Sequence, residues 1–577
     1  MKRLLGYLKP YKKEVVISPL FKFLEAIFDL LVPLVVKYII DVGIAKGDQG
    51  KTDIFAGFGV LIVFAIVGML CALVAQYYAA RAAVGFSTDL RRDLFSHIQK
   101  FSYKETDRVG TSTMITRITA DVNQLQSGVN MTLRLFLRSP VVVFGAMIMA
   151  FTVNAQSALV FVIVIPLLAA VVFTIMLKTV PLFQGVQKNL DRVTSVTREN
   201  LTGVRVIRAL GKEASENERF RAANEEHNRA QNHVGGISAL MNPLTLILVN
   251  AGVILLLWSG AELVQIGEMT QGEVVAMTNY MAQILVELVK FANTIILVNK
   301  AIACGDRVEK VLSAPAGQET IQTDTSGDTS LAVALCGVGL TYENNAAPSV
   351  SGIDLKIPRG TTVGIIGSTG SGKSSLINLI PRFYDATEGR VLVNGRDVRS
   401  YPIEELRNKI AIVPQKAVLF RGTVRSNLLW GNEGADDATL WAALEAAQAK
   451  DFIEAKEGGL DAPVAQNGRN FSGGQRQRLT IARALVRQAE ILILDDSSSA
   501  LDYATDAALR QAIRSLPNHP TVFIISQRTS SLQHADVILV LEDGESVGVG
   551  THEELLKSCE VYREIYDSQF QKGGDEA

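Results

Sequence analysis

A glycine-rich stretch beginning at Thr361, TTVGIIGSTGSGKSSLINLI, holds residue types suited to binding phosphate groups. It reads as a short apolar strand, the pattern GxxxxGKS at Gly367–Ser374, and the start of a helix. Glycines let backbone N–H groups turn inward around phosphate oxygens, and the helix N-terminus adds to the attraction. In this strand–loop–helix context the pattern is specific and predicts a nucleotide site.

The side chains of this loop have separate expected tasks. Lys373 is expected to reach the β- and γ-phosphates of the nucleotide, and Ser374 to ligate Mg²⁺. The other residues expected to contact the nucleotide are Gly367, Ser368, Thr369, Gly370, Ser371, Gly372 and Ser375.

A carboxylate that could hold the magnesium ion lies much later, in ILILDDSSSALD at 491–502. The run Ile491–Leu494 is apolar enough for a buried parallel strand, and Asp495 ends it. An apolar strand ending in Asp is a weak signal alone, but a strong one beside a phosphate loop. Asp495 is therefore predicted to hold the magnesium hydration shell, and Asp496 follows it directly.

A second candidate anion site is FSGGQRQR at 471–478. A serine followed by two glycines at the start of a helix offers another cluster of backbone N–H groups. Since one phosphate loop has no obvious need for a second, we expect this cluster to serve a nucleotide held by a different nucleotide domain. The residues concerned are Phe471, Ser472, Gly473, Gly474 and Gln475.

The elements that must position these groups differ between the two halves of the chain. Its 577 residues are too many for one ordinary core, so two or more domains are expected. The opening MKRLLGYLKPYKK predicts an interfacial helix rather than a signal peptide, because no small-residue cleavage site follows it. Up to about residue 312, six apolar stretches have the length of a membrane span: 15–42, 54–80, 132–154, 156–179, 237–264 and 272–298.

Charge and cysteine content exclude some classes of protein. The 57 basic and 58 acidic residues give a net charge of −1, which does not indicate a nucleic-acid partner. The 4 cysteines are scattered without metal-ligand spacing, so isolated reduced thiols are expected. Two long polar connections, 81–131 and 180–236, read as helical and are rich in Arg and Lys. Basic loops tend to stay cytoplasmic, which places both connections and both termini inside.

Charged side chains within the spans need partners or a water-filled cavity. In the first span Lys22, Glu25 and Asp29 share one helix face. In the last span a polar stripe is formed by Asn279, Gln283, Glu287, Lys290 and Thr294. Internal pairing and a polar wall of a transport cavity both remain open for any single residue. For the stripe as a whole, we favour the cavity.

Taken together, the motifs resemble those of an ABC transporter half-molecule of the exporter type, over essentially the whole chain. Tyr342 in LTYE resembles the aromatic residue that stacks on adenine, and Gly367–Ser374 resembles the Walker A loop. Gln415 in IVPQ resembles the Q-loop residue, which binds ATP and Mg²⁺. FSGGQ resembles the signature, ILILD the Walker B strand, and SALD, ending at Asp502, the D-loop.

The resemblance implies a fold class: a multidomain membrane protein with a six-helix transmembrane domain followed by an α/β P-loop ABC nucleotide-binding domain. We place the transmembrane domain at 1–312, a linker at 313–330 and the nucleotide-binding domain at 331–577. The cofactors implied are ATP and Mg²⁺, with Ser374, Gln415 and Asp495 on the metal. The protein is expected to be multi-pass in a bacterial cytoplasmic membrane, with its nucleotide-binding domain in the cytoplasm.

The family pairs two nucleotide domains head to tail, with ATP between the Walker A loop of one and the signature of the other. The long cytoplasmic loops resemble those that carry coupling helices, here expected near Phe101–Gly110 and Leu210–Ser215. By the same resemblance, the second loop is expected to dock on the nucleotide domain of the partner.

Two positions of the hydrolytic centre depart from the family pattern. Efficient members carry Glu after the Walker B Asp and His in the switch motif, whereas this chain has Asp496 and Gln527. Asp is one methylene shorter, and a misplacement of roughly 1 Å costs about 10²-fold in rate. Gln527 can still donate a hydrogen bond to a γ-phosphate, but it cannot become cationic. Together they predict a site that binds ATP and hydrolyses it slowly.

A poor Walker site beside an unimpaired signature predicts a second half-transporter that supplies the Glu and His. This pattern resembles heterodimeric bacterial exporters with one degenerate ATP site. A homodimer with two slow sites is the alternative. A further departure is Gln466 in VAQNGRN, where the family usually has an acidic residue.

The leading functional interpretation is ATP-driven export of hydrophobic or amphipathic compounds of the multidrug or lipid-like kind. The expected partners are a small amphipathic substrate and membrane lipids, and no nucleic acid. A regulatory ATP-binding subunit of a lipid or peptide exporter is the alternative class. The six spans exclude a soluble ABC protein, and having both domains on one chain argues against an importer.

Overall fold

The structure, a computed structural model, describes residues 2–318, 320–321, 328–343, 345, 347–497 and 499–570. By their contacts the residues separate into two compact units. The first is Met1–Lys100 with Val109–Ala314, and the second is Phe101–Arg108 with Pro315–Ala577.

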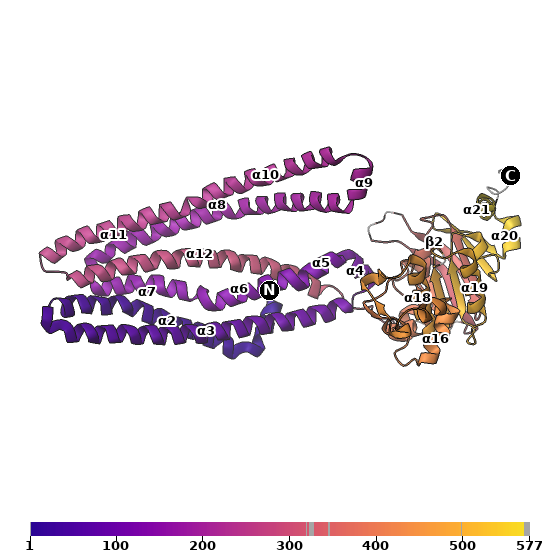
Figure 1. The fold of residues 1–577 in the computed structure, drawn as a ribbon, viewed down its shortest axis with the longest axis horizontal. Helices are drawn as coiled ribbons and strands as arrows, with labels where there is room; N and C mark the ends of the chain where they lie inside the picture. The colour runs from indigo at the N-terminus through magenta and orange to yellow at the C-terminus, as the bar shows by residue number, and fades with distance from the viewer. Residues whose placement is uncertain are drawn as a thin grey trace. The chain divides into compact units, whose positions relative to one another are not determined.

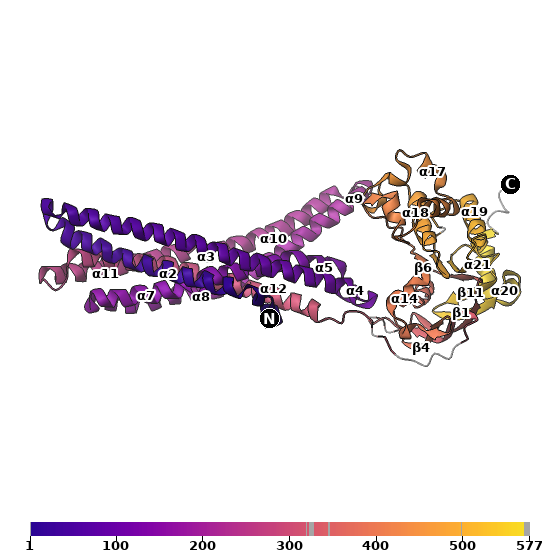
Figure 2. The ribbon, with the colours of Figure 1, turned by 90° about the horizontal axis from the view of Figure 1, so that it is seen from below.

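The first unit consists of long helices. They are α2 (Lys12–Tyr38), α3 (Lys51–Gln99), α6 (Val122–Met131), α7 (Arg138–Val153), α8 (Ala155–Thr202), α10 (Glu213–Ala239), α11 (Met241–Gln265) and α12 (Gln271–Ser313). Short segments connect them: α1 (Lys2–Leu5), α5 (Thr111–Thr116), α9 (Val204–Ala209), 3₁₀ turns at Gly6–Tyr11 and Gly47–Gly50, and π turns at Ile39–Ile44, Arg117–Asp121 and Thr132–Phe136. Helix α2 packs along α3, α8 packs along α10 and α11, and α12 packs against α2, α6 and α7 (Figures 1 and 2).

Five helical stretches of the described residues are long and apolar enough to cross a membrane: Gly47–Gln99, Thr111–Val153, Ala155–Thr202, Glu213–Gln265 and Gln271–Ser313. The predicted first span, 15–42, is not among them. It forms α2 as expected, but the charges of Lys22, Glu25 and Asp29 lower its hydropathy. Helix α2 nevertheless packs along α3, α7 and α12, and its 27 residues make it the sixth described stretch with the length of a membrane span.

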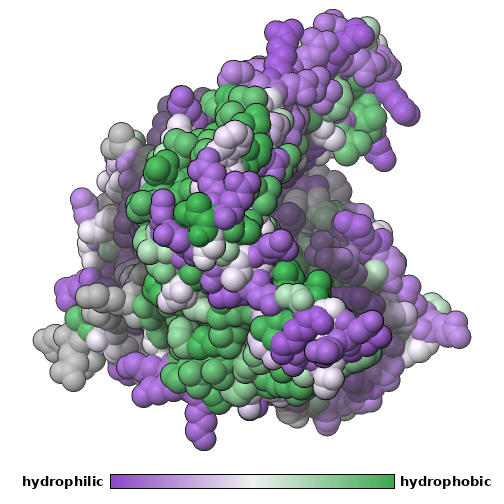
Figure 3. Space-filling view, turned by 90° about the vertical axis from the view of Figure 1, so that its left-hand side faces the viewer, coloured by the Kyte–Doolittle hydropathy of each residue, from purple (hydrophilic) through white to green (hydrophobic). Residues whose placement is uncertain are grey.

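The outer surfaces of α3, α8 and α11 carry many large apolar side chains. Large exposed side chains include Phe58 and Ile66 on α3, Ile163 on α8, and Ile254 and Trp258 on α11. Figure 3 shows hydrophobic residues, in green, over much of the end of the helical unit that faces the viewer. Such a surface requires a lipid environment, because a water-exposed apolar area of this extent is unfavourable.

The second long connection contains a short helix next to the segment Leu210–Ser215, near which a coupling helix is predicted. This helix is α9, Val204–Ala209, and α10 begins at Glu213. Gly211 separates the two helices, because its φ of +60° is a left-handed conformation that ends a helix.

The second unit contains three sheets. The six-stranded sheet has the order β12-β11-β3-β10-β9-β6, the four-stranded sheet β2-β1-β4-β5, and β7 pairs with β8. The strands are β1 (Leu331–Leu340), β2 (Val350–Pro358), β3 (Thr362–Gly367), β4 (Glu388–Val393), β5 (Arg396–Asp397), β6 (Ile410–Val413), β7 (Gly422–Thr423), β8 (Pro463–Val464), β9 (Ile491–Asp495), β10 (Thr521–Ile525), β11 (Val537–Glu542) and β12 (Glu545–Gly550).

Helices surround these sheets. They are α4 (Tyr103–Val109), α13 (Lys373–Ile377), α14 (Ile403–Asn408), α15 (Val424–Leu428), α16 (Asp437–Ala446), α17 (Lys450–Glu454), α18 (Gly473–Val486), α19 (Tyr503–Arg514), α20 (His552–Ser558) and α21 (Glu560–Phe570). Strands β3, β10, β9, β6 and β11 run parallel, and their apolar runs form one wall of a core completed by the four-stranded sheet. Parallel strands bring their carboxyl ends to one edge, which is where β3, β9 and β10 end in candidate site residues.

Candidate nucleotide site

The phosphate loop connects β3 to α13. Gly370 and Gly372 have φ values of +91° and +89°, which side chains other than glycine rarely adopt. A Cβ at Gly372 would also collide with the carbonyl oxygen of Ser349. The two glycines are therefore required by the backbone path of the loop.

Lys373 lies inside the loop. Its Nζ donates to the carbonyl oxygen of Gly367 at 2.9 Å and of Ser368 at 2.5 Å. Burial lowers the pKa of Lys373, while the carboxylates of Asp496 and Asp495 oppose that shift. The charge of this partly buried ammonium group would be stabilised by a further anionic partner, and the phosphates of a nucleotide can be that partner.

Ser374 and Asp495 meet at the edge of the sheet. The Ser374 Oγ donates to Asp495 Oδ1 at 3.1 Å, and burial raises the pKa of Asp495. Oxygen ligands on adjacent corners of a magnesium octahedron, with bonds of about 2.1 Å, lie about 3.0 Å apart. The two oxygens therefore fit Mg²⁺, which prefers hard oxygen ligands, and a cation there would favour the ionised carboxylate.

Asp496 has an unusual backbone. Its φ is +45°, in the left-handed region that Asp tolerates better than most residues. Its amide donates to the carbonyl oxygen of Ile525 at 3.0 Å, and its carboxylate accepts a 3.4 Å bond from Gln415 Nε2. The side chain is thus directed by its neighbours toward the same pocket as the phosphate loop.

One pocket collects most of the predicted Walker-side residues. It is lined by Ser349, Thr369, Gly370, Gly372, Lys373, Ser374, Ser375, Gln415, Asp495, Asp496, Ile525, Ser526 and Gln527. Ser349, Ile525 and Ser526 were not singled out from the sequence. Each lies at the end of a loop or strand whose approach to the phosphate loop is a tertiary contact, so no local pattern marks it.

Tyr342 lies beside the loop rather than in the lining of this pocket. Its hydroxyl donates to Ser375 Oγ at 3.1 Å, and its ring meets that of Tyr384 edge to face at 5.1 Å between centroids. Tyr384 in turn donates to Asp107 of α4 at 2.5 Å. Helix α4 also stacks Tyr103 on Phe383 at 4.2 Å between centroids. The predicted coupling segment thus belongs by contact to the nucleotide-binding unit.

The signature residues lie outside this pocket. Ser472 caps α18: its Oγ accepts from the Gln475 amide at 3.3 Å, and Gln475 Oε1 accepts from the Ser472 amide at 3.0 Å. Phe471 is buried in the core, whereas Gly473 has open space around it. The N-terminus of α18 is thereby preorganised and accessible.

Asp502 serves as the cap of α19. Its Oδ1 accepts from the Thr505 amide at 2.8 Å, and this backbone bond lowers its pKa. Arg528, directly after Gln527, places its guanidinium over the ring of Tyr503 at 5.2 Å. Arg528 of the switch loop therefore contacts Tyr503, the residue that directly follows the predicted D-loop.

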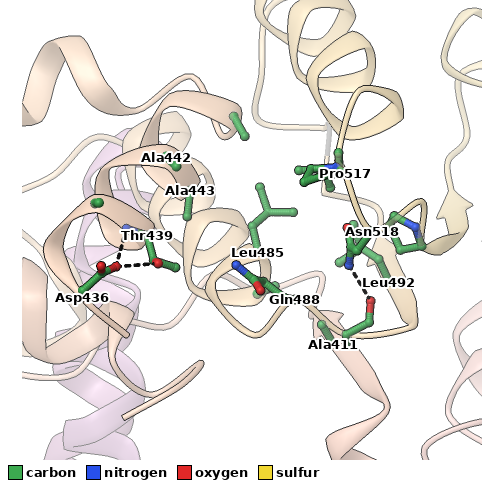
Figure 4. Close-up of a pocket in the computed structure, with 16 residues that line it drawn as sticks. Ala411, Asp436, Thr439, Ala442, Ala443, Leu485, Gln488, Leu492, Pro517 and Asn518 are labelled. Carbon is green, nitrogen blue, oxygen red and sulfur yellow. Dashed lines mark hydrogen bonds between the residues drawn. The ribbon is translucent and has the colours of Figure 1, made fainter. Parts of the chain in front are cut away.

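A second pocket of this unit has a different character. It lies between α16, the end of α18 and the turn before β10 (Figure 4), and alanines such as Ala442 and Ala443 form much of its wall. The amide of Asn518 donates to the carbonyl oxygen of Ala489 at 3.2 Å. None of the predicted site residues lines this pocket, which separates it from the nucleotide site.

The helical unit contains a polar pocket of its own. It is lined by Asp29, Val32, Pro33, Arg138, Val142, Asn279, Ala282, Gln283, Val286 and Glu287. Arg138 bridges three helices, with its guanidinium 2.7 Å from Asp29 and 2.5 Å from Glu287. Lys22 pairs with Glu25 at 2.5 Å and Lys290 with Glu287 at 3.0 Å. Asp29, Arg138 and Glu287 therefore both form ion pairs and line the pocket, so the two alternatives left open by the sequence do not exclude each other.

Arg138 was not singled out from the sequence, although an arginine inside a predicted span was a usable signal. Of the predicted polar stripe, Asn279, Gln283 and Glu287 line the pocket. The Thr294 hydroxyl instead bonds to the carbonyl oxygen of Lys290 in its own helix, at 2.8 Å.

Helices able to cross a membrane, joined to a phosphate loop on a parallel sheet, define an integral membrane protein with a P-loop nucleotide-binding domain. Residues 15–288 match the family described as ABC transporter transmembrane region, and residues 350–499 match the family described as ABC transporter. The chain belongs to the ABC transporter family, and the predicted fold class, a transmembrane helical domain followed by an ABC nucleotide-binding domain, is confirmed.

Similar proteins cover nearly the whole chain. An uncharacterized ABC transporter ATP-binding protein of Mycobacterium tuberculosis is 38% identical, over 98% of this chain and 97% of that protein. An ATP-dependent lipid A-core flippase of Chromohalobacter salexigens is 32% identical, over 99% and 98%. The structure of a bacterial Atm1-family ABC exporter with ATP bound has a TM-score of 0.81 at 22% identity, over 98% of this chain and 99% of that one.

Proposed function

We propose that this chain is the degenerate-site half of a heterodimeric ABC exporter of the bacterial cytoplasmic membrane. Its own phosphate loop holds Mg²⁺–ATP and hydrolyses it slowly, while its signature completes the competent site on a partner that carries the Glu and His. ABC exporters work as dimers. A chain with a poor Walker site and an intact signature fits a different half-transporter that carries a competent Walker site. The transported compound is hydrophobic or amphipathic.

The observation that carries this proposal is the pairing of Asp496 and Gln527 in one pocket. Asp496 has the short carboxylate and a left-handed backbone that Asp tolerates well. Gln527 offers an amide where a general acid–base would need an imidazole. Both residues line the pocket that also contains Lys373, beside which a γ-phosphate would lie.

The intact signature supports the shared-site part of the proposal. Ser472 and Gln475 form a reciprocal cap that leaves the N-terminus of α18 ordered and open to an anion. No signature residue lines the described phosphate-loop pocket, so a nucleotide bound to them belongs to another domain.

The polar pocket of the helical unit supports an amphipathic substrate. Asp29, Asn279 and Gln283 provide hydrogen-bonding groups, while Val32, Pro33 and Val286 provide apolar walls. The relative named as a lipid A-core flippase is consistent with a lipid-like compound. We therefore assign the substrate contacts of this half to this pocket.

The test is to co-express this chain with its genetic neighbour and to measure the ATPase activity of the purified pair in detergent. Replacing the partner's catalytic Glu by Gln should abolish turnover, whereas Asp496→Asn here should leave most of it. Transport of a fluorescent amphipathic compound into inside-out vesicles should follow the same pattern.

Two outcomes would contradict the proposal. If this chain alone hydrolysed ATP at the rate of the pair, the homodimer would be the correct assembly. If the pair bound ATP tightly but neither hydrolysed it nor moved any compound, the chain would be a regulatory ATP-binding subunit.

A further inference from the structure

The switch loop after β10 is held from outside the nucleotide pocket. Gln527 itself is largely exposed, so packing does not fix its side chain. Its carbonyl oxygen accepts a 2.7 Å hydrogen bond from Nε2 of Gln569, near the end of α21. A residue 42 positions away in sequence thus holds the backbone at the position expected to meet the γ-phosphate.

The same amide of Gln569 binds the loop a second time. Its Oε1 accepts from the backbone N–H of Thr529 at 2.9 Å and from the Thr529 hydroxyl at 3.0 Å. Donor and acceptor ends of the amide are both used, which fixes its orientation, because a flipped amide would set N–H groups against the Thr529 N–H. The two ends of Gln569 therefore clamp residues 527–529 as one unit.

Helix α21 is anchored well enough to support this clamp. Tyr562 on α21 is fully buried and lies in one hydrophobic cluster with Leu555, Cys559 and Ile366 of the nucleotide-binding unit. Ile366 lies in β3, immediately before the phosphate loop. The helix thus rests on the strand that carries the loop and reaches over to the switch loop with its C-terminal end.

We propose that Gln569 is a positioning residue for the nucleotide site, which holds Gln527 so that its amide can bond to the γ-phosphate of ATP. This inference rests on the proposed role of Gln527 in the nucleotide site. The clamp explains how the amide of Gln527 can bind the γ-phosphate in place of a charged group. An uncharged donor has no ionic attraction to the phosphate, so its hydrogen bond depends strongly on geometry. We therefore expect the C-terminal helix to control the preference of this site for ATP over ADP.

The test is photolabelling of this chain by 8-azido-ATP and by 8-azido-ADP, each with Mg²⁺, on ice. The full-length chain is co-purified with its partner and identified by a tag. Gln569→Ala should weaken labelling by the ATP analogue about 3- to 10-fold, the factor expected for one misplaced hydrogen bond, and leave the ADP analogue unchanged. Gln569→Glu should have a similar effect, because it keeps the acceptor for Thr529 but lacks the donor to Gln527.

Ser568→Ala is the matched control, since among the described residues that hydroxyl bonds within α21, to the carbonyl oxygen of Ile565 at 2.8 Å. The double variant Gln527→Ala/Gln569→Ala should be no weaker than Gln527→Ala alone, because both remove one interaction. Equal losses for the two analogues, or additive losses in the double variant, would overturn the inference and indicate a role in folding.

The two proposals fail in different ways. A loss of ATP preference in Gln527→Ala without one in Gln569→Ala overturns the clamp alone. No loss in Gln527→Ala overturns the role of Gln527 and the clamp with it. Fast hydrolysis at this site contradicts the degenerate-site proposal but leaves the binding measurement, and hence the clamp, intact.

Discussion

Gln415 Nε2 donates to the carboxylate of Asp496 across 3.4 Å, joining the predicted Q-loop residue to the residue that directly follows Asp495. Asp496 has a φ of +45°, a left-handed conformation in which Asp is less strained than a longer or branched residue. Aspartate therefore suits the backbone conformation at this position, and its short side chain keeps the carboxylate hydrogen-bonded to Gln415.

The first prediction concerns hydrolysis at this site. Asp496→Glu with Gln527→His should raise turnover by about 10-fold or more, because it extends the carboxylate and adds a group able to carry a proton. The measurement is ATPase activity of a pair whose partner carries Gln in place of its catalytic Glu. Asp496→Asn/Gln527→His is the control, and an equal gain there would contradict the role of the carboxylate.

The second prediction concerns magnesium. Asp495→Asn should raise the Mg²⁺ concentration needed for ATP labelling about 10-fold or more, and Ser374→Ala should raise it less, since the carboxylate supplies the charge. A Mg²⁺ titration of labelling measures both. Ser375→Ala, which removes the bond to Tyr342 rather than to Asp495, should leave the requirement unchanged. A normal requirement in Asp495→Asn would refute the assignment.

The phosphate loop and the signature could be predicted from sequence because each is contiguous, with glycines spaced for one backbone path. The clamp by Gln569 could not, since it joins two segments 42 residues apart and a lone glutamine in a helix has no distinguishing pattern. The partners of Arg138 were equally hidden, because Asp29 and Glu287 lie on other helices. The boundary between α9 and α10 at Gly211 could not be predicted either, because glycine adopts positive and negative φ about equally readily.

The third prediction concerns coupling. Tyr384→Phe removes the hydroxyl that donates to Asp107 but keeps the ring against Tyr342. ATP labelling should stay within about 2-fold, whereas stimulation of ATPase activity by substrate should fall about 3-fold, the effect of one lost hydrogen bond. Tyr401→Phe is the control, because that hydroxyl bonds to the carbonyl oxygen of Val393 within the nucleotide-binding unit. Equal effects of the two variants would argue against a specific role of Tyr384.

The fourth prediction concerns the stability of the helical bundle. Arg138→Ala leaves the buried Glu287 without its closest partner and should destabilise the protein by about 3–5 kcal/mol. Arg138→Met with Glu287→Gln should cost less, because no buried charge of that pair remains. Arg192→Ala, which breaks an exposed pair with Glu226, should change little. Thermal unfolding in detergent, followed by tryptophan fluorescence, ranks the three variants.

The fifth prediction concerns pH and helix α21. His552 Nδ1 lies 2.7 Å from the hydroxyl of Tyr562, and burial raises the pKa of Tyr562 to about 12. At neutral pH the hydroxyl is therefore protonated and forms a hydrogen bond with a neutral imidazole. Burial of His552 lowers its own pKa below the usual 6.5, with a nearby carboxylate of Glu553 opposing the shift.

The sign of the pH effect follows from that depressed pKa. Above about pH 6.5 the imidazole is neutral in both folded and unfolded chains, and its contribution to stability is complete. As the pH falls through the lower folded pKa, that contribution is lost, because the unfolded chain takes up the proton more readily. Amide hydrogen exchange in α21, corrected for intrinsic rates, should therefore accelerate between pH 7.5 and pH 5.5 relative to the exchange in α19. His552→Asn places a neutral amide near Tyr562 and should remove this difference, and a pH dependence that persisted in that variant would assign it to another group.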